Sequence, residues 1–256
     1  MAQNRFSRRL LGSDLNSSLW RLLALCLLGG LCVPGLRELT RMIVAPGPVV
    51  RLLNGDERAT AAAAKRAKAI GQPWAMLGLA ERGGAPERNN RLAKAAAMAP
   101  NDETIAIRRA IGLALRPTAP EVPAPHSQID EHLGQAARHA IAIAPDNAVG
   151  WYLLAASQVR QGQRAAALES VSRGNAAARC DDHSREAYSA AAQLSQAAGT
   201  PAFESWFLCM STLTYNHLSA YREVARGLMQ PGASLADRLV VAGMGARLCD
   251  ESNTLI

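Results

Sequence analysis

Two groups of side chains in this chain of 256 residues have the chemistry of metal ligands. In the first, His132 and His139 are seven residues apart, with Glu131 beside them. On a helix this spacing puts both imidazoles on one face, but about 10 Å apart along the axis, which is too far for one ion. We therefore expect solvated histidines there.

The second group is Asp181-Asp182-His183, which lies between two expected helices. Two carboxylates and an imidazole could hold a cation. An Asp pair ahead of a helix is more commonly an N-cap, in which a carboxylate accepts hydrogen bonds at the positive end of the helix dipole. We expect the capping role, and we expect no metal and no cofactor in the chain.

The five cysteines form no zinc or redox pattern. Cys26 and Cys32 fall in an apolar segment, whereas Cys180, Cys209 and Cys249 are widely spaced. Nucleophile-elbow, Walker, dinucleotide-binding and H-E-x-x-H patterns are also missing from the sequence. We expect no catalytic residues and do not expect an enzyme.

An apolar segment near the amino terminus is the first element of the chain. Residues 22–36 (LLALCLLGGLCVPGL) carry no charge. If the side chain of Arg21 reaches the lipid headgroups, the span becomes 19–36 and measures about 27 Å, close to the thickness of a hydrocarbon core. We expect a transmembrane or signal-anchor helix at 19–36, preceded by a basic leader (1–18) and followed by a juxtamembrane linker (37–54).

The charges on the two flanks of this segment favour one orientation by a narrow margin. Four arginines precede the apolar segment, and three follow it by residue 51. The positive-inside rule then places the amino terminus in the cytoplasm. Residues 33–35 and 43–45 fit a signal-peptidase site only loosely, so an uncleaved anchor is the favoured reading. We expect a single-pass protein of a bacterial inner (cytoplasmic) membrane with an extracytoplasmic soluble domain.

Two segments in the body of the chain are near copies of each other. Residues 93–102 (AKAAAMAPND) and 138–147 (RHAIAIAPDN) share three alanines at matched positions and a proline that an Asn/Asp pair follows. Proline cannot continue a helix, and Asn or Asp can cap the next one. Each copy therefore predicts the end of one helix and the start of another.

Each copy is associated with a second pattern, WAMLG at 74–78 and WYLLA at 151–155. These runs resemble the opening of the tetratricopeptide (TPR) repeat, a 34-residue pair of antiparallel helices. The resemblance implies an all-α, TPR-like α-solenoid over residues 55–256, clearest over 74–178. In such a stack each Trp is a packing residue between helices.

The spacing departs from the family in ways that the sequence explains. Pro100 and Pro145 are 45 residues apart rather than 34. The segment 117–127 (PTAPEVPAPHS) contains four prolines and accounts for the excess as an inserted loop. Ser127 and Asp130 then predict a capping box for the next helix.

Beyond residue 178 the repeat pattern weakens. A degenerate unit beginning at Tyr188 is expected to continue the stack, followed by helices over 218–229 and 235–248. Together with the Ala-rich segment 59–70, we expect roughly nine soluble helices and no strand.

In TPR proteins the first helices of the repeats line a concave surface that binds peptides. The resemblance carries this role to seven positions here: Arg82, Thr104, Arg108, Tyr152, Arg160, Gln193 and Gln196. Three arginines and a tyrosine would suit an acidic peptide. The alternative is that all seven are ordinary solvated side chains.

Composition and charge limit the class of function. With 49% apolar and 19% charged residues, the chain is not wholly disordered. The net charge of +7 divides into +10 over residues 1–116 and −3 over 117–256, so the basic surplus lies nearest the expected anchor, where it suits anionic headgroups.

We expect a non-catalytic, membrane-anchored scaffold that binds a protein or peptide. The alternatives are a basic nucleic-acid-binding helical module, which lacks the aromatic interleaving typical of that class, and an accessory subunit of a membrane or envelope enzyme complex. The oligomeric state stays open.

Overall fold

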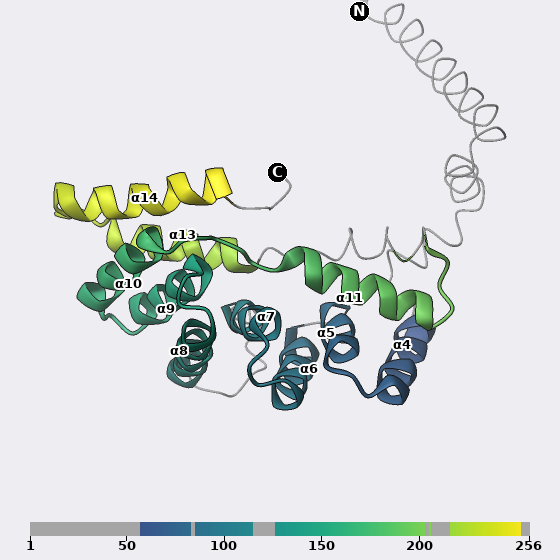
Figure 1. The fold of residues 1–256 in the computed structure, drawn as a ribbon. Helices are drawn as coiled ribbons and strands as arrows, with labels where there is room; N and C mark the ends of the chain where they lie inside the picture. The colour runs from purple at the N-terminus through teal and green to yellow at the C-terminus, as the bar shows by residue number, and fades with distance from the viewer. Residues whose placement is uncertain (1–56, 83–84, 115–125, 203–204, 206–215, 252–256) are drawn as a thin grey trace, which may run out of the picture. The chain divides into compact units, whose positions relative to one another are not determined.

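The computed structural model describes residues 57–82, 85–114, 126–202, 205 and 216–251. These residues form an all-α domain of ten helices and contain no β-strand (Figure 1). The helices are α4 (Glu57–Ile70), α5 (Pro73–Glu81), α6 (Ala85–Met98), α7 (Glu103–Ala114), α8 (His126–Ile143), α9 (Ala148–Arg160), α10 (Arg164–Ala176), α11 (Ser184–Ala197), α13 (Asn216–Leu228) and α14 (Leu235–Glu251).

The chain divides into two compact units, Met1–Arg58 and Ala59–Ile256, and the second is the helical domain. The expected leader, apolar segment and linker over 1–54 lie outside the described residues, as does most of the proline-rich segment 117–127. Within the described part of the chain, no helix is both long enough and apolar enough to span a membrane.

The helix ends follow the two near-copies in the sequence. Helices α6 and α8 each end two residues before their proline, Pro100 or Pro145. The Oδ1 atom of Asp102 then accepts a hydrogen bond from the third residue of α7, and Oδ1 of Asn147 accepts one from the second residue of α9. The predicted stops and caps are therefore confirmed. Helix α8, however, begins at His126, so Ser127 lies inside its first turn.

From α5 to α10, each helix packs against the next one along the chain. Alanines dominate the contacts, and Ala110, Ala137, Ala140 and Ala155 are all fully buried. Small side chains let helix axes approach closely, while larger ones such as Leu133 fill the remaining space. Sequential pairing of Ala-rich helices is thus the basis of the first half of the domain.

The C-terminal helices do not extend this row. Helix α11 packs on α5 and contacts α7, α13 packs on α9 and contacts α7, and α14 packs on α10 (Figure 1). The prediction that a unit at Tyr188 continues the stack is wrong, because α11 runs back across α5 instead of lying along α10. Helices α11 and α13 therefore cover α5, α7 and α9, the first helix of each pair.

Gly78 lies where the backbones of α5 and α11 cross closely. A Cβ atom built on Gly78 would lie 2.5 Å from the carbonyl oxygen of Ala190 and 2.9 Å from the backbone nitrogen of Ala191. Both contacts are with backbone, which cannot swing aside as the end of a side chain can. The glycine of the WAMLG run is thus required by α11, more than one hundred residues away in the sequence.

We predict that Gly78→Ala destabilises the domain by about 1–3 kcal/mol, because α5 and α11 must separate to accept the methyl group. Gly245→Ala is the matched control, since nothing lies within 4 Å of a Cβ there. That change should be neutral or stabilising by up to about 1 kcal/mol. Urea unfolding followed by circular dichroism measures both, and equal stability of Gly78→Ala and wild type would disprove the close crossing.

Candidate functional site

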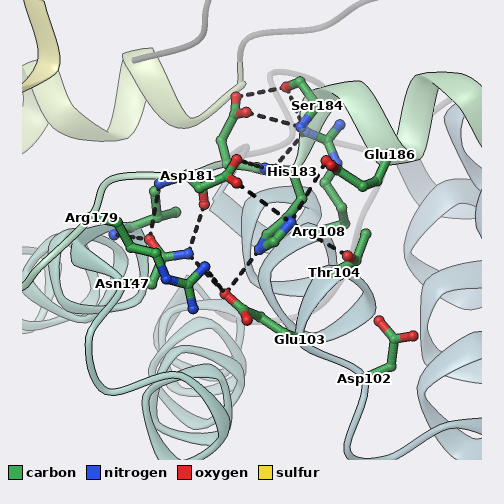
Figure 2. A network of polar contacts seen from close by, with 12 residues as sticks. Asp102, Glu103, Thr104, Arg108, Asn147, Arg179, Asp181, His183, Ser184 and Glu186 are labelled. Carbon is green, nitrogen blue, oxygen red and sulfur yellow. Dashed lines mark hydrogen bonds and ion pairs between the residues drawn. The ribbon is translucent and has the colours of Figure 1, made fainter. Parts of the chain in front are cut away.

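A network of polar side chains surrounds the connection between α10 and α11, residues 177–183, where it passes the N-terminal ends of α7 and α9 (Figure 2). The network draws on α7, the turn before α9, the connection itself and the first turn of α11. It brings the Asp181-Asp182-His183 run together with titratable side chains from other helices that the sequence did not link to it.

Asn147 joins three of these segments. It is fully buried, and its Oδ1 atom accepts hydrogen bonds from the backbone N–H groups of Val149 and Asp181, each at 3.2 Å. Its Nδ2 atom donates to the backbone oxygen of Asp181 at 2.8 Å and to Oε1 of Glu103 at 3.2 Å. The amide therefore fills its capacity of two donated and two accepted hydrogen bonds.

Glu103, the first residue of α7, is the acceptor at the centre of the network. Its Oε1 atom lies 2.6 Å from Nη1 of Arg179 and 2.9 Å from Nε2 of His183, in addition to the Asn147 contact. Partial burial alone would raise the pKa of Glu103, but the hydrogen bonds from Arg179, His183 and Asn147 outweigh it and lower the pKa to about 2. The carboxylate is thus ionised at neutral pH.

His183 sits directly before α11 in a left-handed backbone conformation, with φ of 53°. Such a conformation is uncommon for a residue other than glycine and is typical of constrained sites. The side chain is buried, with 10% of it exposed. Its Nδ1 atom faces three oxygen-bearing side chains: Thr104 at 3.4 Å, Glu186 at 3.7 Å and Asp181 at 3.9 Å.

Asp182 bonds to the first residue of α11, although the N-cap position itself is taken by His183, whose side chain makes no capping hydrogen bond. Its carboxylate accepts hydrogen bonds from the backbone nitrogen of Ser184 at 2.9 Å and from the Ser184 hydroxyl at 2.6 Å. It also lies 3.3 Å from Nε2 of His217 on α13. Burial lowers the pKa of His217 to about 4 in spite of the opposing effect of Asp182, so this imidazole is neutral at pH 7.

Arg108, one of the seven residues expected to line a peptide groove, is buried at the edge of this network. Its Nε and Nη2 atoms donate to the two carboxylate oxygens of Glu81, at 3.0 and 2.9 Å, and Nη1 donates to the hydroxyl of Ser184 at 3.2 Å. Its side chain is 3% exposed. Arg108 therefore joins α5, α7 and α11 and presents no free charge to a ligand.

Arg160 and Tyr152 are also buried, and both contact residues of α13. The side chain of Arg160 is 2% exposed, and its Nε donates to Glu223 at 2.9 Å while Nη1 lies 3.6 Å from Asp130. Asp130 is thus an ion-pair partner of Arg160. Tyr152 is fully buried, and its ring meets that of Tyr221 edge-on at 5.7 Å between centroids.

The remaining four candidates lie nearer the surface but do not form one patch. Arg82 is half-buried and donates to the hydroxyl of Ser195 on α11, and Thr104 contacts His183. Gln193 and Gln196 are exposed on α11. In this structure the expected concave surface is therefore filled by the chain's own α11 and α13, and its buried arginines are not open to a peptide.

The first group of metal-ligand residues behaves as the spacing predicts. His132 is exposed, and Nε2 of His139 lies 3.0 Å from the backbone oxygen of Pro100. Sequence reasoning missed Glu103, Arg179 and His217 in the second group, because the network draws on four segments distant in sequence. The one local sign of the network in the sequence was the Asp-Asn pair before α9. Arg179 donates two hydrogen bonds to the carboxylate of Asp146, at 3.0 and 3.2 Å.

We predict that acid destabilises the domain in two steps. His217 has a native pKa of about 4, below its ordinary 6.5, so the unfolded chain binds the proton first and stability falls as pH drops from 6.5 to 4. Glu103 has a native pKa of about 2, below its ordinary 4.5, so its contribution is present above pH 4.5 and is lost toward pH 2.

Urea midpoints measured from pH 8 to pH 2.5 test this prediction. His217→Gln should flatten the upper step, and Glu103→Gln should flatten the lower one. Glu169→Gln removes an exposed carboxylate on α10 that pairs only with Arg173 among the described residues, so it should leave both steps in place. Steps of wild-type size in the first two variants would contradict the assignment.

The sequence and the helical domain can both be compared with those of known proteins. Comparison with protein-family models, with curated proteins and with solved structures gives no match. What the structure establishes is an all-helical domain of ten packed helices in the described residues, with sequential helix-pair contacts in its first half.

Proposed function

We propose that this protein is a non-catalytic, TPR-like scaffold, anchored in the bacterial inner membrane by residues 19–36, that binds an amphipathic helix of a partner protein on the outer face of α14. The repeat part of the proposal is supported by three helix pairs, α5–α6, α7–α8 and α9–α10, each of which contacts the next pair. Two of the three pairs begin with the Trp-containing runs of the sequence.

The usual peptide-binding surface of such a scaffold is not open in this chain. Helices α11 and α13 lie on the first helices of the pairs, and Arg108 and Arg160 are neutralised by carboxylates of the same domain. A partner surface must therefore be sought elsewhere on the domain.

The observation that supports α14 is that its exposed side is apolar. Leu235 is 74% exposed and Leu239 is 64% exposed, the two highest values among large apolar residues in the described part of the chain. Ala242, Ala246 and Cys249 are exposed as well. These five residues follow one another at intervals of four, three, four and three, so they form a single stripe, which we call the α14 seam.

The opposite side of α14 is also apolar. Val241 and Met244 are 4% and 3% exposed and belong to the main core cluster, packed against α10 and α13. Uncovered apolar surface is unfavourable in water and marks interaction sites. The α14 seam is therefore the side on which a partner is expected.

The geometry of the seam favours a helix as the partner. Alternating intervals of four and three residues are those of a coiled-coil contact, in which apolar residues of two helices interlock. The small residues Ala242 and Ala246 allow a partner helix to come close. Arg238, exposed beside Leu239, would meet an acidic residue on the flank of that helix. This retains the acidic partner that the sequence suggests but moves it to another surface.

Photo-crosslinking in native membranes tests the seam. A photoreactive amino acid at position 239 should give an adduct with one partner protein, whereas the same group at the exposed position 236, off the seam, should give none. Leu235→Glu should abolish the adduct at 239, because a buried charge has no counter-ion in an apolar contact. The domain should remain folded by circular dichroism, since Leu235 is exposed.

Two outcomes would count against this surface. Equal crosslinking at 236 and 239 would mean that the seam has no special role. An adduct with a second copy of this chain, together with a dimer in analytical ultracentrifugation, would mean that the seam is a self-association surface rather than a site for another protein.

We further predict that the full chain stays in the membrane fraction after a carbonate wash, and that deletion of residues 1–36 releases it. Protease added to spheroplasts should digest the helical domain if it lies outside the cytoplasm. Release of the full chain by carbonate would exclude the anchor, and protection in spheroplasts would place the domain in the cytoplasm.

A further inference from the structure

Three side chains with metal-ligand chemistry meet at the start of α11. One ligand atom each from Asp181, His183 and Glu186 can be chosen so that all lie within 4.8 Å of one another. The imidazole nitrogen Nδ1 is 3.7 Å from the nearer Glu186 oxygen and 3.9 Å from the nearer Asp181 oxygen. These separations are longer than hydrogen bonds, which rarely exceed about 3.2 Å for nitrogen and oxygen.

The orientation of the imidazole leaves Nδ1 ready to act as a ligand. The other ring nitrogen, Nε2, is 2.9 Å from Oε1 of Glu103. With Nε2 on Glu103, the Nδ1 edge of the ring faces Asp181 and Glu186, and the hydroxyl of Thr104 lies 3.4 Å from Nδ1 (Figure 2). A carboxylate behind the imidazole is the common arrangement around metal-bound histidines, where it fixes the tautomer and raises the basicity of the ligand nitrogen.

The local charges also favour a cation. The nearby guanidinium groups are committed elsewhere, Arg179 to Glu103 and Asp146, and Arg108 to Glu81. Among the described residues, no Lys or Arg side chain forms an ion pair with Asp181 or Glu186. The positive end of the α11 dipole opposes a cation, but Asp182 already accepts the first N–H group and the Ser184 hydroxyl there.

We propose that Asp181, His183 and Glu186 bind one divalent transition-metal ion of the zinc class, with Glu103 as the residue that positions His183. A tetrahedral zinc ion with bonds of about 2.0–2.1 Å holds its ligand atoms about 3.4 Å apart. The two separations from Nδ1, 3.7 and 3.9 Å, approach this value, and Glu186 can move closer because its side chain is 50% exposed. Three protein ligands leave one coordination position for water.

Such an ion would stabilise the position of α11 against α5 and α7. Asp181 and His183 belong to the connection, Glu186 belongs to α11, and Glu103 extends the link to α7. Because the unfolded chain lacks the site, binding of the ion would stabilise the folded domain in proportion to its affinity. This inference concerns the inside of the domain and does not rest on the partner proposed for α14.

Zinc itself is the probe. The full chain, purified in detergent with Cys249→Ser to remove an exposed thiol, is stripped with EDTA and dialysed against zinc, and bound metal is measured by mass spectrometry. We expect one ion per chain and a higher melting temperature in zinc. Cobalt in place of zinc should give the intense visible absorption of a tetrahedral site.

Matched variants assign the ligands. Glu186→Gln and His183→Asn should each weaken zinc binding by about tenfold or more, and Asn tolerates the left-handed backbone of position 183. Glu169→Gln, an exposed carboxylate on α10, should bind as wild type does. Should His183→Asn unfold, Glu186→Gln decides the matter, since the Glu186 side chain is half-exposed and pairs only with His183 among the described residues.

Two results would overturn the proposal. One is the absence of stoichiometric zinc from the wild-type chain, which would mean that Asp181, His183 and Glu186 serve only as polar contacts at the start of α11. The other is zinc binding that is equal in wild type and Glu186→Gln, which would place the ion elsewhere on the chain.

Discussion

The arrangement of this domain depends on one buried amide. Asn147 uses all four of its hydrogen-bonding positions to join the start of α9, the connection after α10 and the first residue of α7. These bonds hold the connection at the N-terminal ends of α7 and α9. A buried amide that lacks a hydrogen-bond partner lowers the stability of the fold, so the connection after α10 is restricted to positions that satisfy Asn147. The direction of α11 follows from the position of this connection.

That direction determines what several polar side chains of the helix pairs do in this chain. Arg108, Arg160 and Tyr152 were expected to line a peptide groove, yet each contacts α11 or α13 of its own domain. Burying arginine requires a carboxylate partner with good geometry, which Glu81 and Glu223 supply. The same residue types at the same spacing therefore serve packing between layers rather than recognition of a peptide.

The sequence predicted what is locally determined. The ends of α6 and α8, and the caps at Asp102 and Asn147, follow from a proline and a polar side chain within a few residues of each other. The path of α11 could not be predicted in this way, since Gly78 is compatible with any close helix contact and only the structure shows that Ala190 makes it. Likewise His183 gains Glu103 and Thr104 as neighbours only when the connection meets α7, whereas Asp181 and Glu186 lie within three residues of it in the sequence.

The contact between α5 and α11 also bears on how the chain reaches its final form. In a simple solenoid every repeat touches only its neighbours, so repeats can form one after another as synthesis proceeds. Here Leu194 completes the cluster that contains Ala67 and Leu79, and the first helix pair stays partly uncovered until more than one hundred further residues have been made. Contacts so distant in sequence slow folding and prolong the exposure of apolar surface. We therefore expect late, cooperative closure of the domain, with chaperone protection needed until α11 arrives.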